Sequence, residues 1–264
     1  MAEISPTRPV LDFQDRVVIV TGGAKGIGKV YSERLAEAGA RVVIADIDHE
    51  ANEALARAIN NKGGAALPFK TDVASPEITQ AMADAAAAKW GRIDGLVNNA
   101  SLMSVLARRS WFDIPVEEWD RVMAVNLRGI FLCCRAVYPQ MKKQGRGKIV
   151  NISSSRVWEG TANRLHYTTS KAGVVGLTRA LAREVGDDNI TVNAISPGFT
   201  LSETQVASST NAYMSNKATA LAHKSLKRDQ VPDDLVGALM FLLSDASSYI
   251  TGQTLNVDGG HMMH

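Results

Sequence analysis

The chain has 264 residues, of which 45% are hydrophobic and 21% charged, and its 29 basic and 27 acidic side chains leave a formal net charge of +2. These proportions are typical of a folded globular protein and exclude disorder as the main state. The nearly balanced charge also lacks the basic footprint of a nucleic-acid-binding protein, so we expect no nucleic-acid partner.

The cysteines and the two chain ends indicate a cytoplasmic protein without metal. Cys133 and Cys134 are adjacent, which suits buried thiols in a reducing compartment better than a disulfide. The N-terminal sequence has no charged region followed by an apolar stretch, and the apolar runs are far too short for a membrane span. The terminal His261-Met262-Met263-His264 has no third ligand at credible spacing, so we expect neither a metal site nor a membrane partner.

Short apolar runs alternate with helical stretches along most of the chain. The pattern predicts strands at 17–20, 42–45, 66–70, 95–97, 148–152 and 190–195. It predicts helices near 26–38, 51–60, 76–90, 117–143 and 167–185. Nearly continuous apolar strands between helices are typical of a parallel sheet that is covered on both faces.

The fold class predicted from this alternation is α/β, with a single doubly wound Rossmann-type parallel sheet of about seven strands flanked by helices. No repeat, linker or change in composition divides the chain, so we expect residues 1–264 to form a single domain. Residues 199–228, rich in Ser, Thr and Asn, are the least regular segment and are long enough to form a substrate loop or lid.

A glycine-rich turn with the sequence TGGAKGIG joins the first predicted strand to the first helix. Glycines in such a turn let a pyrophosphate approach the backbone and the helix N-terminus. The spacing differs from the general GxGxxG fingerprint, and by itself it also fits an ordinary turn. Its context favours phosphate binding, for which the candidates are Gly22, Lys25, Gly26, Ile27 and Gly28.

Asp46 ends the second predicted strand, 18 residues after Gly28, where a carboxylate can accept hydrogen bonds from both ribose hydroxyls. A 2′-phosphate would lie beside its negative charge, so Asp46 predicts NAD in preference to NADP. Lys25 argues the other way, because a cation in the loop can contact a phosphate. We favour NAD because Asp46 occupies the 2′ position directly; the alternative is a solvated strand end.

Two further loops supply candidates for the adenosine half of a dinucleotide. Asp72 and Val73 follow the third strand and are candidates to flank the adenine. Asn98, Asn99 and Ala100 follow the fourth strand and would place backbone and amide groups near the adenosine ribose. Each of these residues alone also fits an ordinary loop.

Tyr167 and Lys171 lie four residues apart at the start of a predicted helix, which places both side chains on one face. A nearby ammonium and an oxidised nicotinamide ring both favour the phenolate of the tyrosine. Lowering the phenol pKa from about 10 to about 7 requires roughly 4 kcal/mol of differential stabilisation. Ser154, 13 residues upstream, and Asn126 in the preceding long helix make the pair more specific.

These motifs occur in the order and spacing of the short-chain dehydrogenase/reductase family, which the chain resembles from Arg16 to Gly260. The residues that carry the resemblance are the glycine loop, Asp46, Asn98-Asn99-Ala100, Asn126, Ser154, Tyr167, Lys171 and Pro197-Gly198. One departure is Ser101, which stands where the family usually has glycine and puts the local backbone in question.

The resemblance implies an oxidoreductase that transfers a hydride between nicotinamide C4 and a secondary alcohol or ketone, with Tyr167 as the acid/base. It also implies that Ser154 hydrogen-bonds the substrate oxygen and that Lys171 binds the nicotinamide ribose and lowers the Tyr167 pKa. Asn126 would hold a water molecule that links Lys171 to solvent. Pro197, Gly198 and Thr200 would lie beside the nicotinamide, with Thr200 near its carboxamide.

The family builds its substrate pocket from segments that correspond here to 101–111, 156–158 and 201–226. Met103, Arg156 and Trp158 are candidate contacts, and Arg108 and Arg109 are candidates to join Arg156 in holding an anion. The alternative is that the arginines lie in solvated loops and the tryptophan packs internally.

Relatives in this family assemble as homotetramers through two long helices, which correspond here to 117–143 and 167–185. The small residues Ala172, Gly173 and Gly176 would permit close helix contact there. We expect the same assembly for this chain.

Two other functions fit the sequence. A 3-oxoacyl-thioester (acyl carrier protein) reductase shares these motifs but normally uses NADPH, which Asp46 disfavours. A non-catalytic nucleotide-sensing regulator would keep the fold, but it would be expected to lose Tyr167 or Lys171.

Overall fold

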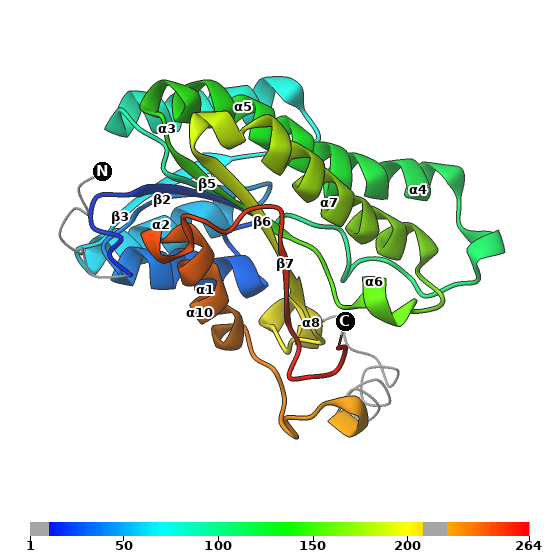
Figure 1. Cartoon of the computed structure of the whole chain (residues 1–264). Helices are drawn as coiled ribbons and strands as arrows, with labels where there is room; N and C mark the ends of the chain where they lie inside the picture. Colours follow the sequence, from blue (N-terminus) through cyan, green and yellow to red (C-terminus); the bar gives the residue numbers. More distant parts are fainter. Residues whose placement is uncertain (1–10, 208–220, 264) are drawn as a thin grey trace.

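The computed structural model describes residues 11–207 and 221–263, so residues 1–10, residues 208–220 of the expected substrate loop and His264 lie outside the described part. Its centre is one parallel sheet with the strand order β3-β2-β1-β4-β5-β6-β7 (Figure 1). The strands are β1 (Val17–Thr21), β2 (Arg41–Asp46), β3 (Ala65–Lys70), β4 (Gly95–Asn98), β5 (Gly147–Ile152), β6 (Ile190–Pro197) and β7 (Thr254–Val257). The predicted doubly wound sheet is confirmed.

Helices cover both faces of the sheet (Figure 1). One face carries α1 (Gly26–Glu37), α2 (His49–Asn61) and α10 (Asp233–Leu243). The other carries α3 (Pro76–Trp90), α5 (Gly129–Gln144) and α7 (Leu165–Glu184), with α4 (Val116–Met123) before α5. Shorter elements are α6 (Arg156–Glu159), α8 (Glu203–Ala207), the 3-10 turns η1 (Trp111–Asp113), η3 (Gly186–Asp188) and η4 (Asp245–Ser247), and the π-helical turn η2 (Ala124–Arg128).

The continuous apolar sequence of β1 results from burial on both faces of the sheet. Val18 and Val20 belong to the core under α1 and α10, whereas Val17 and Ile19 belong to the core under α3 and α5. Side chains alternate between the two faces of a strand, so in a central strand between two helix layers successive side chains enter one core or the other. The same burial accounts for Cys133 and Cys134, which are free thiols in the second core.

The strand order places the site, because it reverses at β1. From β1 the chain goes to β2 on one side, and after β3 it continues at β4 on the other side. The ends of β1 and β4 are in register, with Thr21 opposite Asn98. In sheets of this kind the crevice at this reversal, at the carboxyl ends of the strands, is where ligands bind.

The long helical region before β5 contains an irregularity. It runs from Val116 to Gln144 and changes to the π-helical turn η2 around Asn126. Such π turns inside helices occur frequently at functional sites. By length and hydropathy alone this region, within the described residues, would suffice to cross a membrane; half of its most apolar window is buried in the fold, as in the core helix of a soluble protein.

Close packing explains one glycine of the loop after β1. A Cβ on Gly28 would lie 1.9 Å from the carbonyl oxygen of Gly22, which is backbone and has no flexible end to move. Gly22 itself has a φ of +61°, which favours glycine. The loop therefore folds back on the first turn of α1 with no room for a side chain.

We expect Gly28→Ala to lower the free energy of unfolding by about 1–3 kcal/mol, because the extra methyl group overpacks the loop. Gly237→Ala is the matched control: it lies within α10, where a Cβ would meet nothing within 4 Å. Alanine in an unobstructed helix position stabilises by roughly 0.5–1 kcal/mol. Urea denaturation of both variants measures these changes, and a stable Gly28→Ala protein would contradict the packing argument.

Candidate active site

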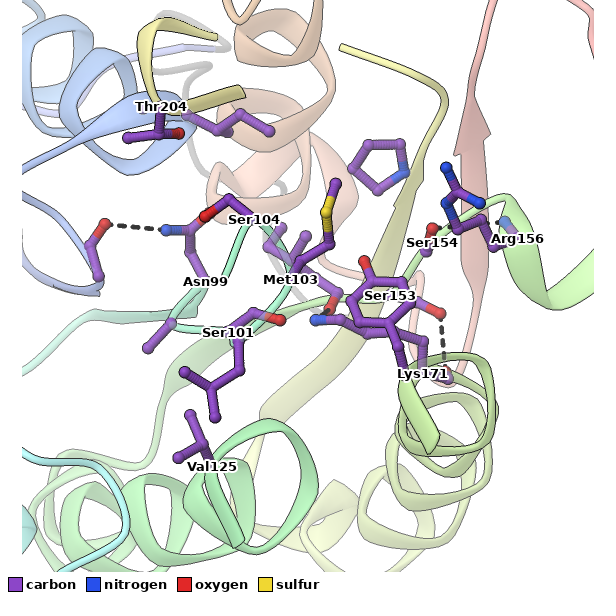
Figure 2. Close-up of a pocket in the computed structure, with 18 of the residues that line it drawn as sticks. Asn99, Ser101, Met103, Ser104, Val125, Ser153, Ser154, Arg156, Lys171 and Thr204 are labelled. Carbon is purple, nitrogen blue, oxygen red and sulfur yellow. Dashed lines mark hydrogen bonds between the residues drawn. The ribbon is translucent and has the colours of Figure 1, made fainter. Parts of the chain in front are cut away.

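A cavity of about 740 Å³ opens at the carboxyl ends of the strands, and Figure 2 shows part of its lining. It brings together most of the residues that the sequence singled out. From the cofactor candidates the lining includes Gly22, Lys25, Gly26, Ile27, Asp46, Asp72, Val73, Ala100, Pro197, Gly198 and Thr200. From the catalytic and substrate candidates it includes Met103, Ser154, Arg156, Tyr167 and Lys171.

Asn99 ties the glycine loop to the end of β4. Its side-chain Nδ2 donates to the carbonyl oxygens of Thr21 and Gly22 at 3.1 and 3.0 Å. In return, the Thr21 hydroxyl accepts from the backbone N–H groups of Asn99 and Ala100 at 3.0 and 3.2 Å. These bonds fix the loop where the strand order reverses, and the sequence reasoning gave Asn99 no such role.

The structure corrects the prediction for the side chain of Asn98. It is 2% exposed and donates to Asn151 Oδ1 at 2.9 Å, so it ties β4 to β5 and does not line the cavity. The period of a strand gives the reason: Asn98 and Asn99 point to opposite sides. Gly28 also lies outside the lining, because it packs against the loop instead.

The end of β2 carries a charged group of three residues. The two carboxylate oxygens of Asp46 accept from the backbone N–H groups of Ala24 and Asp48, each at 3.1 Å. Lys25 Nζ forms an ion pair with Asp48 Oδ2 at 2.5 Å. This hydrogen bond raises the pKa of Lys25 and lowers the pKa of Asp48. The lysine of the loop is therefore already paired with a carboxylate.

The N-terminus of α1 binds a carboxylate of the chain itself, that of Glu203. The backbone N–H of Gly26 donates to Glu203 Oε1 of α8 at 3.2 Å, and Lys29 Nζ lies 3.8 Å from the other oxygen of that carboxylate. A Cβ on Gly22 would lie 2.9 Å from Ala100 Cα, so only glycine lets this loop lie so close to the loop after β4. The loop thus fits the pyrophosphate of a dinucleotide, since the first N–H groups of a helix have no partner within the helix and bind anions, as the Glu203 carboxylate does here.

Lys171 and Tyr167 lie at the other end of the cavity. The ammonium group of Lys171 donates to the carbonyl oxygen of Ile152 at 2.8 Å and lies 5.8 Å from the centre of the Tyr167 ring. Ser153, which Figure 2 shows next to Lys171, donates to the lysine's carbonyl oxygen at 2.9 Å. The Ser154 hydroxyl accepts from the backbone N–H of Arg156 at 3.3 Å.

Burial dominates the pKa values of this pair. It raises the pKa of Tyr167, while the hydrogen bond to Ser154 and the charges of Arg156 and Arg164 act in the opposite direction. Burial also lowers the pKa of Lys171 to about 7. Neighbouring cations favour the phenolate, but the low-dielectric surroundings, which the spacing of residues does not reveal, favour the neutral form of both groups in the protein alone.

Asn126 lies next to the site without lining the cavity. Its Oδ1 accepts from the Leu102 N–H at 2.7 Å, and its Nδ2 donates to the Leu102 carbonyl oxygen and to Ser170 Oγ, both at 3.2 Å. It therefore joins the π-helical turn, the loop after β4 and α7. A water-holding role for Asn126 stays a prediction.

The substrate candidates divide into two groups. Met103, Arg108 and Arg156 line the cavity. Trp158 is not among the described lining residues: its indole N–H points to Ser196 Oγ and Asn256 Oδ1 at 3.2 and 3.0 Å, which fits the alternative of internal packing. Arg109 is also turned away and pairs with Glu118 at 3.3 Å.

The cavity lining also contains Thr200, whose hydroxyl has a partner that the sequence did not predict, and residues that the sequence did not single out. The Thr200 hydroxyl donates to the carbonyl oxygen of Gly198 at 3.0 Å, so it closes its own turn. Ser202 and Thr204 also line the cavity and share a hydrogen bond of 3.0 Å. Their place in the irregular segment after Pro197-Gly198 was the only signal for them in the sequence. Ser101 lines the cavity and is accommodated there.

This geometry defines a nucleotide-binding oxidoreductase of the Rossmann type. A family model described as enoyl-(acyl carrier protein) reductase matches residues 22–262. The chain belongs to the short-chain dehydrogenase/reductase family and is an NAD(P)-dependent dehydrogenase or reductase that acts on CH-OH groups.

The relatives cover nearly the full length of the chain. The probable galactose dehydrogenase of Rhizobium meliloti (strain 1021) is 40% identical over 97% of this chain and 98% of its own. A 3-oxoacyl-[acyl-carrier-protein] reductase of Thermotoga maritima is 37% identical over 94% and 98%. A solved structure of 7α-hydroxysteroid dehydrogenase with NADH and 7-oxo glycochenodeoxycholic acid has a TM-score of 0.89 at 33% identity, over 97% of both chains.

The buried ammonium of Lys171 predicts a pH-dependent effect on stability. Between pH 7 and 10.5 the unfolded chain binds a proton at this lysine that the folded chain does not, so the penalty of its burial is complete below pH 7 and decreases as the pH rises. Lys171→Met should therefore raise the free energy of unfolding on the order of 1–3 kcal/mol at pH 6 and by less at pH 9.

Urea denaturation of the wild type and the variant at both pH values measures this difference. Lys62→Met, at an exposed position after α2, is the control and should change little at either pH. An equal effect of Lys171→Met at pH 6 and pH 9 would contradict the lowered pKa.

Proposed function

We propose that the protein is an NAD-dependent oxidoreductase that transfers a hydride between nicotinamide C4 and a secondary alcohol or ketone. The observation that carries the proposal is that Ser154, Tyr167 and Lys171 lie in the same cavity as the glycine loop and Asp46. When bound, the nicotinamide supplies the hydride acceptor or donor and, in its oxidised form, a positive charge.

In this proposal the Tyr167 phenol exchanges a proton with the substrate oxygen, and Ser154 hydrogen-bonds that oxygen. Lys171 contacts the nicotinamide ribose and, with a pKa near neutrality, holds or releases the proton that Tyr167 exchanges. Asn126 binds the backbone of Leu102 in the loop after β4 and the side chain of Ser170 in α7. It therefore supports the position of α7, which carries Tyr167 and Lys171.

The preference for NAD over NADP rests on the charges at the end of β2. Asp46 lines the cavity where a 2′-phosphate would meet its negative charge. Lys25, the cation that would favour a phosphate, is paired with Asp48. Both observations support a ribose with a free 2′-hydroxyl.

The same charges argue against a 3-oxoacyl-thioester reductase that uses NADPH, although a relative carries that name. The non-catalytic regulator is disfavoured because Ser154, Tyr167 and Lys171 are all present and share one cavity. A dehydrogenase or reductase of a small alcohol or ketone is the function that the site supports best.

We also propose a cytoplasmic homotetramer of single-domain subunits, assembled through α5 and α7. Ala172 and Gly176 are exposed on α7, whereas Gly173 packs against Leu127 of the same chain. The contact between subunits would therefore use Ala172 and Gly176. A tetrameric mass in sedimentation at micromolar concentration would support this assembly.

Replacing the phenol hydroxyl tests the proposed acid/base. Tyr167→Phe should lower kcat by about 10²–10⁴-fold, the range for removal of a general acid/base. Tyr249→Phe is the matched control, because Tyr249 is fully exposed, and it should keep the activity. A panel of alcohols and ketones with NAD(H) and NADP(H) provides the assay, and wild-type turnover by Tyr167→Phe would refute the mechanism.

Removing the charge at the end of β2 tests the cofactor preference. Asp46→Asn should raise the ratio of kcat/KM for NADP over NAD by about 10–100-fold, since it removes a like-charge contact with the 2′-phosphate. Asp84→Asn on the exposed side of α3 changes the net charge equally and should leave the ratio unchanged. A wild-type preference for NADP would overturn the argument from Asp46.

A further inference from the structure

Three arginines gather at the catalytic end of the cavity, each from a different segment. Arg108 lies in the loop after β4, Arg156 begins α6 two residues after Ser154, and Arg164 directly precedes α7. Arg108 and Arg156 line the same cavity as Ser154 and Tyr167. Figure 2 shows Arg156 beside Ser154.

Several arginines elsewhere in the described residues pair with a carboxylate, whereas Arg108 and Arg156 do not. Arg92, Arg109 and Arg228 pair with Asp94, Glu118 and Asp234 at 2.6, 3.3 and 2.6 Å. The guanidinium groups of Arg108 and Arg156 form no ion pair and no hydrogen bond with any residue of the described part. Within residues 11–207 and 221–263, the side-chain donors of these two cations are therefore available to a ligand.

Arg164, which is not among the described lining residues, adds a third positive charge near Arg108 and Arg156. Its guanidinium donates to Met103 Sδ and to the Leu106 carbonyl oxygen at 3.1 and 3.0 Å, while its Nε is buried without a partner in the described part. Burial, with the charges of Arg156 and Arg108, lowers its pKa to about 10, so it remains a cation at neutral pH. Burial and Arg156 also lower the pKa of Arg108.

The carboxylates nearby do not balance this group. Glu159 is the acidic residue of the lining at this end, and it accepts from the Thr161 hydroxyl at 2.6 Å. Asp46 and Asp72 belong to the opposite part of the lining, with the glycine loop and the end of β3. The catalytic end of the cavity thus carries more positive than negative charge, and the cofactor end carries acidic groups.

We propose that the substrate is a secondary alcohol or ketone that bears a compact oxyanion, a carboxylate or a phosphate, which Arg108 and Arg156 bind. The proposal rests on the proposed function, since it names the substrate class of the same site. Guanidinium groups bind both oxyanions through paired hydrogen bonds. With its anion on the arginines and its oxygen at Ser154 and Tyr167, the substrate is held at two points, which orients its reacting carbon.

Ligand binding tests the substrate class without requiring turnover. The probes are cyclohexanecarboxylate, cyclohexyl phosphate and the neutral cyclohexanecarboxamide, titrated calorimetrically into the full-length protein in the presence of NADH. We expect at least one of the two anions to bind at least tenfold more tightly than the amide, and the difference to decrease as salt is added. The anion that binds more tightly identifies the oxyanion as carboxylate or phosphate.

Arg108→Gln and Arg156→Gln should each remove most of the preference for the anion and change the Kd of the amide less than threefold. Arg57→Gln is the matched control, because Arg57 is exposed on α2 and pairs with Glu53. It makes the same change in net charge and should keep the preference.

Equal binding of anions and amide by the wild type, or no binding of either anion, would overturn the proposal. So would a preference that survives both arginine substitutions. Failure of the proposed function gives a different result: the anion preference persists, but no alcohol is oxidised with NAD. Turnover of neutral alcohols without an anion preference would leave the proposed function intact and refute the substrate class.

Discussion

The hydrogen bonds of Asn99 to the backbone of Thr21 and Gly22 hold together the two halves of the site. They join the loop after β1 to the loop after β4 at the point where the strand order reverses. The first loop places the glycine backbone and the N-terminus of α1, and the second continues into the segment that contains Met103 and Arg108. The glycine-rich loop and the loop after β4 are thus fixed relative to one another by the Asn99 amide, together with the Thr21 hydroxyl.

The two ionisable groups at the catalytic end of the cavity are buried at a cost in folding stability. Tyr167 is 6% exposed and Lys171 is 2% exposed, and both lie where water is scarce. Burial favours the neutral form of each group, so charges introduced by a ligand act in a medium that screens them weakly. The hydrogen bond from Lys171 to the Ile152 carbonyl offsets only part of the cost of burying an ammonium. Such unfavourable burial is characteristic of sites in which pKa values are tuned for function.

Much of this arrangement was predictable, because it depends on local patterns. Apolar runs such as 17–20 gave the strands, and the residues at their carboxyl ends meet at one edge in any parallel sheet. What escaped prediction depends on the tertiary structure. Asn98 faces Asn151 on the neighbouring strand, Trp158 reaches Ser196 and Asn256, and the pKa of Tyr167 responds to burial that no spacing reveals. The strand period places Asn98 and Asn99 on opposite sides, but it does not tell which of the two faces the neighbouring strand.

The contact between Glu203 and Gly26 has a consequence for the binding of a dinucleotide. The Gly26 N–H donates to this carboxylate, so a dinucleotide pyrophosphate that accepted from the same N–H would compete with Glu203. Glu203 begins α8, and α8 follows the segment from Pro197 to Ser202 that borders the catalytic end of the cavity. A pyrophosphate at the N-terminus of α1 would therefore compete with a carboxylate of the chain itself, and part of its binding free energy would offset the loss of the Glu203 contact.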